Sequence, residues 1–95
     1  MKNNIGVFGE LRRTYLRNHR FGIYNGMLLK GTLWEHLADV NRQAEEMLDL
    51  ITLQMKSQEG ITEELKSRDQ MEWVRRMTSI HARAQEIVLQ ELIYS

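Results

Sequence analysis

The sequence contains neither cysteine nor proline among its 95 residues. Without cysteine it can form no disulfide framework and perform no thiolate chemistry, which fits a reducing compartment. No apolar run reaches the ~18 residues that a membrane span needs, and the first residues lack the apolar region of a signal peptide. We therefore expect a cytoplasmic protein with no membrane partner. A chain of this length predicts one domain with a thin core, which oligomerisation would support.

Motifs for catalysis and metal binding are also missing. The histidines His19, His36 and His81 form no HExxH motif, and no cysteine can complete a zinc set. A metal site would therefore need His36, Asp39 or Glu35 to converge with His81 from the other long helix. The adjacent acids Glu45 and Glu46 point in different directions on a helix, which does not suit paired acid–base catalysis. There is no nucleophile elbow and no phosphate-binding loop. The sequence therefore predicts a protein that is not an enzyme and that has no metal or cofactor.

The last third of the sequence has the pattern of one long amphipathic helix, from Asp69 to Tyr94. Asp69 and Glu72 have the spacing of a capping box at the helix start. Apolar or small residues recur at alternating steps of four and three, which places them on one face. These residues are Trp73, Met77, Ile80, Ala84 and Ile87. The face is widened by Val74, Val88 and Leu92 and extended at its two ends by Met71 and Ile93. At ~1.5 Å per residue the helix would be roughly 39 Å long, and it needs a partner surface to be stable in water.

A second long helix is predicted from Thr32 to Gly60. Thr32 and Glu35 have the spacing of a capping box, and Gly60 is expected to end the helix in the left-handed conformation. Its apolar face has the same alternating steps and consists of Leu33, Leu37, Val40, Ala44, Met47 and Ile51. The connector from residue 61 to residue 68 should hold one helical turn capped by Thr62. Two such faces and a short connector predict an antiparallel hairpin, residues 32–60 against residues 69–94.

Residues 1–31 are predicted to form a basic helical arm that packs across this hairpin, giving a small all-α bundle. A first helix should run from Ile5 to Asn18, capped by Asn3 or Asn4. After a break at residues 19–22, a short apolar segment at residues 23–30 should form one or two helical turns. Gly6 and Gly9 weaken the first helix by ~1 kcal/mol each relative to alanine. A dimeric bundle is the main alternative, since one small helix leaves much of the apolar surface uncovered.

The formal net charge is zero, but the charges are unevenly distributed. Residues 1–31 hold six basic residues against one acidic residue, whereas residues 32–60 hold six acidic against two basic. The basic stretch contains Arg12, Arg13, Arg17 and Arg20, of which the last three share one face of a helix. Guanidinium groups in this arrangement predict contacts with nucleic-acid phosphates. The alternatives are a solvated surface, a protein contact, or pairing with the chain's own acidic helix.

A second candidate surface lies on the acidic helix and would bind a protein partner. Its residues are Glu35, Asp39, Glu45, Glu46 and Asp49. Trp34 and Trp73 each lie near a predicted helix start, where a large aromatic side chain more often closes the end of a core than lines a partner groove.

The sequence resembles the TnpV family of small transposon-encoded proteins of Gram-positive gut bacteria. The residues that carry this resemblance are the C-terminal DQMEWVRRMTSIHARAQEIVLQELIYS, the N-terminal LRRTYLRNHR, the middle LLKGTLWEHLADVNRQAEEML and the connector EGITEELKSRDQ. The resemblance implies a mobile genetic element and brings no catalytic residues with it. Small proteins of such elements typically bind element DNA, assist a recombinase, regulate transcription or disarm host defence, for instance as anti-CRISPR proteins.

These observations together predict a non-enzymatic accessory protein of a mobile element. Its expected partner is nucleic acid or a nucleic-acid-processing complex, bound through the basic N-terminal helix. The alternatives are a protein-directed inhibitor that binds a recombinase or a CRISPR nuclease complex, and a helical assembly module. Both alternatives would act through the acidic helix surface.

Overall fold

Helices account for nearly all of residues 5–95, which are the residues that the computed structural model describes, and none of these residues lies in a strand. The predicted all-α class is therefore confirmed. The elements are α1 (Gly6–His19), α2 (Phe21–Lys30), α3 (Leu33–Gln58), α4 (Glu63–Arg68), α5 (Gln70–Val88) and a π-helical turn, η1 (Leu89–Ile93). The predicted cap at Asn3 or Asn4 lies outside the described residues.

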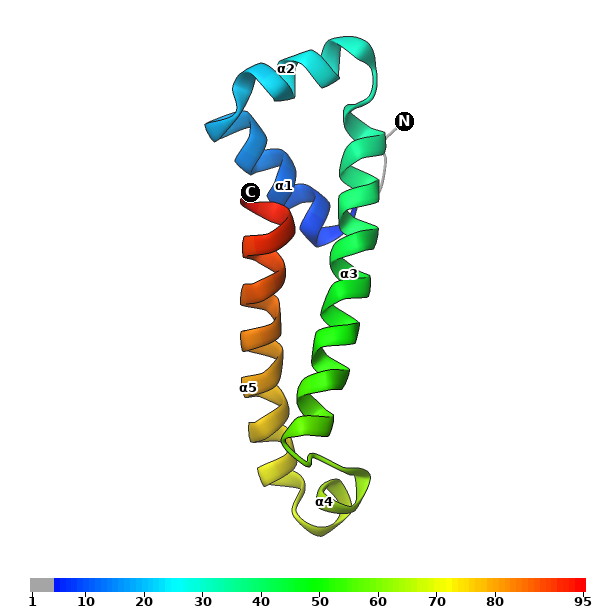
Figure 1. Cartoon of the computed structure of the whole chain (residues 1–95), viewed down its shortest axis with the longest axis vertical. Helices are drawn as coiled ribbons and strands as arrows, with labels where there is room; N and C mark the ends of the chain where they lie inside the picture. Colours follow the sequence, from blue (N-terminus) through cyan, green and yellow to red (C-terminus); the bar gives the residue numbers. More distant parts are fainter. Residues whose placement is uncertain (1–4) are drawn as a thin grey trace.

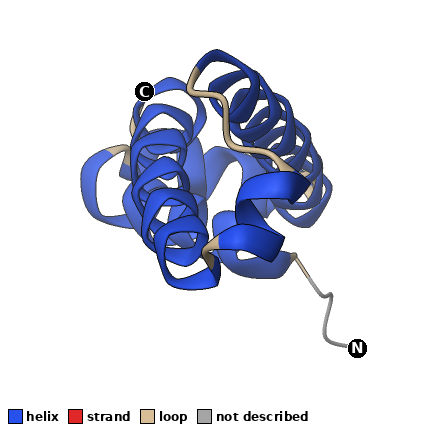
Figure 2. Cartoon of the chain, turned by 90° about the horizontal axis from the view of Figure 1, so that it is seen from below, coloured by secondary structure: helices blue, strands red, loops and turns tan. Residues whose placement is uncertain are grey.

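The long helices α3 and α5 lie side by side and antiparallel, as the apolar patterns predict (Figure 1). Helix α1 crosses this hairpin near the end of η1, while α2 spans one end of the molecule and α4 closes the other. The extents are 55 × 26 × 18 Å, so the molecule is a short rod. Seen end-on, the helices are joined by short loops (Figure 2). The predicted hairpin covered by a basic N-terminal helix is thus the observed architecture.

The buried side chains form three small clusters along the rod. The first lies where α2 packs on α1 and α3, and contains Ile5, Leu16, Leu33 and Leu37. The second joins α1, α3, α5 and η1 through Phe8, Val40, Ala44, Val88 and Ile93. The third lies at the α4 end and contains Ile61, Leu65 and Ile80. Because only two long helices run through the far half of the rod, the N-terminal arm supplies much of the packing in the near half.

The buried face of α5 is narrower than the prediction. Val88 and Ile93 are fully buried, as predicted. Ile87, Val74 and Met71 are also predicted on this face, but they are 39%, 48% and 85% exposed. A π-helical turn follows Val88, in which the amide of Tyr94 donates to the carbonyl oxygen of Leu89 five residues earlier, at 2.9 Å. A step of five residues brings Ile93 under Val88, a place that a regular α-helix gives to a residue three or four positions on.

Three of the predicted helix ends are confirmed. The side chain of Asp69 accepts a hydrogen bond from the amide of Glu72 at 3.1 Å, and that of Thr62 accepts one from the amide of Leu65 at 3.2 Å. Gly60 adopts the left-handed conformation, with φ of 66°. These contacts satisfy backbone groups that helix ends leave unpaired.

The capping box predicted at Thr32 is wrong, because its side chain makes no capping hydrogen bond. Gly31 ends α2 with φ of 76°, and the amide of Thr32 then donates to the carbonyl oxygen of Met27 at 2.9 Å. This is the Schellman arrangement of a helix C-terminus. Thr32 is held at φ −105° and ψ −1°, whereas an N-cap side chain needs an extended backbone to reach back to the new helix.

The N-terminal arm is more helical than the sequence predicts. Only Arg20 separates α1 from α2, so the predicted four-residue break is wrong and α2 is a ten-residue helix.

Of the two tryptophans, Trp73 packs on the third buried cluster, as expected for a core residue. Trp34 is 39% exposed, so the prediction that it closes a core is wrong.

An ion pair joins the two long helices at the α4 end of the rod. Arg83 donates to both carboxylate oxygens of Glu59, at 2.7 and 3.1 Å. These hydrogen bonds lower the pKa of Glu59 below its ordinary value of 4.5. Both side chains reach solvent, so the pair contributes modestly to stability.

We expect the contribution of this pair to disappear in acid. A carboxylate whose pKa is lowered by folding stabilises the fold above its ordinary pKa and loses that effect as the pH falls through the lowered value. Thermal unfolding of the parent chain and Glu59→Gln should therefore differ near neutral pH and coincide at a pH well below 4.5, the ordinary pKa of Glu59. An equal difference at both pH values would contradict this assignment.

Candidate nucleic-acid interface

Helix α1 is fixed against α3 by the side chain of Asn41. Its Oδ1 atom accepts hydrogen bonds from the backbone amides of Phe8 and Gly9, at 3.1 and 3.3 Å. Asn41 thereby supplies the cap that Ile5, at the helix start, does not provide. The apolar pattern of the sequence does not identify Asn41 as a functional residue. Its one signal is a side-chain amide next to Val40, at the border of the apolar face.

Gly6 and Gly9 allow this close approach of α1 to α3. Gly6 has φ of 74°, and a Cβ atom there would lie 2.4 Å from the side-chain amide of Asn41. A Cβ atom at Gly9 would lie 3.0 Å from the carbonyl oxygen of Leu37. Gly6 and Gly9, which weaken an isolated helix, therefore allow α1 to pack closely on α3. The orientation that they permit decides which arginines of α1 face the protein and which face solvent.

Arg12 faces the protein. Its Nη1 atom donates to the carbonyl oxygens of Ile93 and Ser95, at 2.8 and 3.1 Å. Its guanidinium group also lies 5.8 Å from the ring centroid of Tyr15. Burial lowers the pKa of Arg12, although a guanidinium group remains charged at neutral pH. Arg12, which the sequence predicts to bind phosphate, therefore binds backbone carbonyl groups at the C-terminal end of the last helix, where positive charge is favourable.

Arg13 is half-buried and partly engaged. Its Nη1 atom lies 3.0 Å from Oε2 of Glu10, one turn earlier on α1. Its guanidinium group also lies 5.6 Å from the ring centroid of Trp34, at the start of α3. This stacking holds the charge at the surface between the two helices. An i,i+3 pair at the surface is weak enough to exchange for a phosphate contact.

Arg17 and Arg20 are exposed, and no hydrogen bond or ion pair joins either guanidinium group to any of residues 5–95. Each of the other arginines makes a side-chain hydrogen bond, namely Arg12, Arg13, Arg42, Arg68, Arg75, Arg76 and Arg83. Arg17 belongs to the last turn of α1, and Arg20 is the single residue between α1 and α2. The corner where these two helices meet lies away from α3 (Figure 1). We call Arg13, Arg17 and Arg20 the α1 arginine cluster. No acidic residue occurs from residue 11 to residue 34.

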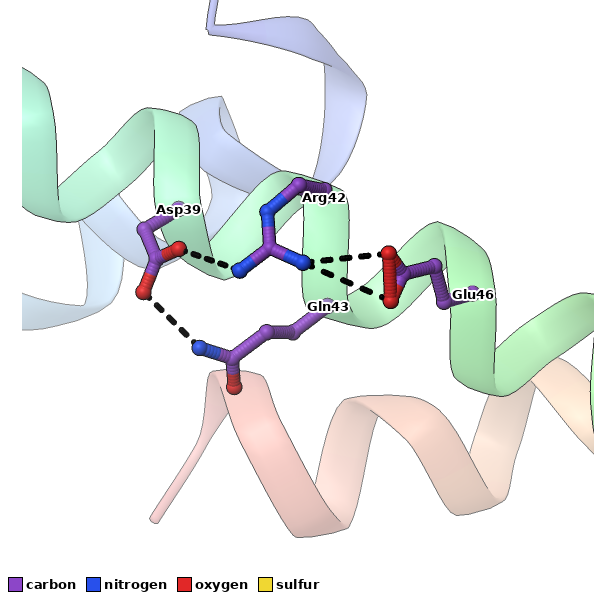
Figure 3. A network of polar contacts seen from close by, with 4 residues as sticks. All are labelled: Asp39, Arg42, Gln43 and Glu46. Carbon is purple, nitrogen blue, oxygen red and sulfur yellow. Dashed lines mark hydrogen bonds and ion pairs between the residues drawn. The ribbon is translucent and has the colours of Figure 1, made fainter.

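The five acids of the second predicted surface all lie on α3, and three of them are already bonded within that helix. Arg42 donates to Asp39 at 2.6 Å and to Glu46 at 3.0 Å, and Gln43 completes this network (Figure 3). The hydrogen bond from Arg42 lowers the pKa of Asp39. Glu45 accepts a hydrogen bond from Asn41 at 2.7 Å.

The remaining two acids, Glu35 and Asp49, are exposed. Among residues 5–95, none of the ion pairs joins an arginine of α1 to an acid of α3. Within these residues, the arginines of α1 are therefore not paired with the acidic residues of α3, which was one of the alternatives for the basic stretch. The α1 arginine cluster and the acidic surface remain two separate surfaces.

A shallow open pocket of about 390 Å³ lies between the end of α2 and the start of α3. Its lining consists of Met27, Thr32, Glu35, His36 and Asp39. Burial, reinforced by the nearby Arg12, lowers the pKa of His36, while Asp39 opposes the shift. His36 is therefore neutral at neutral pH and adds no charge to the arginine cluster. Among residues 5–95, no three His, Cys, Asp or Glu side chains are grouped to hold a metal ion.

Fold and surface together define a small helical bundle whose α1 carries a cluster of arginines, two of them exposed and unbonded within residues 5–95. Comparison with known families adds an identity: the family model for "Transposon-encoded protein TnpV" matches residues 1–93. The chain belongs to this family, whose name indicates a transposon-encoded protein. Neither the curated proteins nor the solved structures gave a match to the chain. Within the described residues, no helix has both the length and the apolar character needed to cross a bilayer.

Proposed function

We propose that this protein is a non-enzymatic accessory protein of a mobile genetic element, and that it contacts nucleic-acid phosphates through Arg13, Arg17 and Arg20. The observation that carries the proposal is the state of Arg17 and Arg20. Their guanidinium groups are exposed and unbonded within residues 5–95, while the chain's other arginines are engaged. A charged group without an internal partner is available for an external one.

The chemistry of the cluster suits the nucleic-acid backbone more than the base edges. Guanidinium groups bind phosphate oxygens through paired N–H donors, and such contacts set position and affinity without reading sequence. Phe21 is 60% exposed, and its ring lies 6.2 Å from that of Tyr24 beside the cluster. An exposed aromatic ring next to a phosphate-binding group can stack on an unpaired base. Guanidinium–phosphate contacts release counterions, so binding should be salt-sensitive.

A second candidate function is a protein-directed inhibitor or adaptor that uses the acidic surface of α3. Glu35 favours it, since this exposed acid lines the open pocket together with the apolar side chain of Met27. A basic side chain of a partner would find both charge and apolar contact there. Charge reversal at Glu35 and Asp49 should abolish inhibition of a recombinase or a CRISPR nuclease under this reading. The same readout should not respond to loss of the α1 arginine cluster.

The nucleic-acid proposal is tested by removing the two unbonded arginines together. We expect Arg17→Ala with Arg20→Ala to weaken binding of a fluorescent DNA fragment at low salt roughly tenfold or more, because two charge-assisted contacts are lost. Fluorescence anisotropy measures this affinity. The matched control is Arg75→Ala with Arg76→Ala, which removes the same charge from α5, where both side chains pair with Glu72.

The control should bind within about twofold of the parent chain, as expected for residues outside the interface. Equal losses in the two double variants would reduce the effect to net charge and contradict the assigned site. No binding by the parent chain at low salt would remove nucleic acid as the partner.

A further inference from the structure

Trp34, at the start of α3, has a large aromatic ring that lies outside the buried core. It is 39% exposed and belongs to none of the three buried clusters formed within residues 5–95. Trp73, by contrast, packs on the third of these clusters. A tryptophan left at the surface loses the stabilisation that burial of its ring would give. The exposed ring of Trp34 therefore calls for an explanation other than the stability of the fold.

The ring of Trp34 adjoins the α1 arginine cluster. The guanidinium group of Arg13 lies 5.6 Å from the centroid of this ring. Two other aromatic side chains of residues 5–95 are strongly exposed, Phe21 and Tyr94, and their rings lie against tyrosine rings. Trp34 and Arg13 thus place an aromatic ring and a positive charge side by side at the surface.

This pair is held in place by rigid helices. Arg13 also pairs with Glu10 at 3.0 Å, and Asn41 fixes α1 on α3. Arg17 lies one turn further along α1, about 6 Å along the helix axis, and shares a face with Arg13. The ring and two of the phosphate-binding groups therefore keep their relative positions before any ligand binds.

We propose that Trp34 stacks on an unpaired base of a single-stranded nucleic acid, next to the phosphates that Arg13 and Arg17 bind. This inference rests on the proposed function and names the form of nucleic acid that the site takes. A phosphate bound at Arg13 brings its own base close to Trp34, because a single sugar joins the phosphate and the base of a nucleotide.

The chemistry of stacking explains why the strand should be single. In a duplex, neighbouring base pairs cover the faces of each base, whereas an unpaired base can turn a face toward a protein ring. Every base has such a π face, so stacking on Trp34 should tolerate any sequence. A duplex could still contact the arginines through its phosphates, but it would gain nothing from Trp34.

The test compares a thymidine oligonucleotide with an abasic strand of the same length, which has the same phosphates and no bases. By fluorescence anisotropy at low salt, the parent chain should bind the thymidine strand about fivefold or more tightly, as expected for one stacked base. Trp34→Leu should bind the two strands equally. Trp34→Phe keeps an aromatic ring and should retain most of the preference. Both variants should fold, since Trp34 lies outside the buried clusters.

The abasic strand separates this inference from the proposed function. Equal binding of the two strands by the parent chain would overturn the stacking site and leave the phosphate contacts standing. If Trp34→Leu kept the preference of the parent chain, the base contact would lie at another side chain and the inference would be wrong. Binding of neither strand by the parent chain would contradict the proposed function and this inference together.

Tryptophan fluorescence gives a direct readout of the stacked ring, because the chain contains two tryptophans and each can be removed in turn. Trp73→Phe leaves Trp34, whose emission the thymidine strand should quench and the abasic strand should not. The matched control is Trp34→Phe, which leaves Trp73 in the third buried cluster, at the α4 end of the rod. The emission of Trp73 should not respond to either strand. Quenching of Trp73 without quenching of Trp34 would overturn the proposal.

Discussion

Replacing Gly6 with alanine is expected to lower the free energy of unfolding by about 2–4 kcal/mol. Two effects add. An alanine at φ of 74° is strained, and its Cβ atom would lie 2.4 Å from the side-chain amide of Asn41. Asn41 would then move and give up its hydrogen bonds to the amides of Phe8 and Gly9, which start α1. Chemical denaturation of the parent chain and the variant measures the difference.

Gly26→Ala is the matched control for this experiment. Its Cβ atom would meet no other atom within 4 Å, and the residue lies inside α2 with an ordinary helical backbone. Alanine should therefore stabilise the monomer by about 0.5–1 kcal/mol. If both variants shifted stability in the same direction, the close approach of α1 to α3 through Asn41 would be wrong.

The second large effect is expected at Arg12. Arg12→Ala should lower the free energy of unfolding by about 1.5–3 kcal/mol, because charged hydrogen bonds to the carbonyl oxygens of Ile93 and Ser95 are lost. Arg17→Ala removes the same charge from the same helix at an exposed position, and it should change stability by less than about 0.5 kcal/mol. Thermal or chemical unfolding separates the two variants.

These two arginines should also separate in binding. At a temperature where both variants are folded, Arg17→Ala should weaken phosphate contact more than Arg12→Ala does. The reverse order, with Arg12 the larger binding contributor and Arg17 the larger stability contributor, would contradict the division of α1 into an inward and an outward arginine.

The hairpin could be predicted from the sequence because its signals are local and periodic. Leu33, Leu37, Val40 and Ala44 are all buried, as the alternating steps of four and three require. The packing of Ile93 directly under Val88 could not be predicted in the same way. It depends on the π-helical turn at residues 89–93, and a fixed period of 3.6 residues contains no step of five.

The candidate site was predicted as a segment but not in its details. The arginine stretch is visible in the sequence, and the long-range contacts that divide it are not. Arg12 is bonded to residues more than eighty positions away, and α1 is oriented by Asn41, more than thirty positions away. The capping box predicted at Thr32 is wrong for a related reason. The amide of Thr32 donates to the carbonyl oxygen of Met27 in the turn that ends α2 at Gly31, and this contact fixes the backbone of Thr32.

The measurement that tests the central claim most directly is the salt dependence of DNA binding by the parent chain and by Arg17→Ala with Arg20→Ala. Three phosphate contacts by the α1 arginine cluster predict that the logarithm of the binding constant falls linearly with the logarithm of salt concentration, with a slope of about −2.7 on duplex DNA. Loss of Arg17 and Arg20 should reduce that slope to about −0.9. A slope that is the same in both proteins, or no binding by the parent chain at low salt, would contradict the assignment of this cluster to nucleic acid.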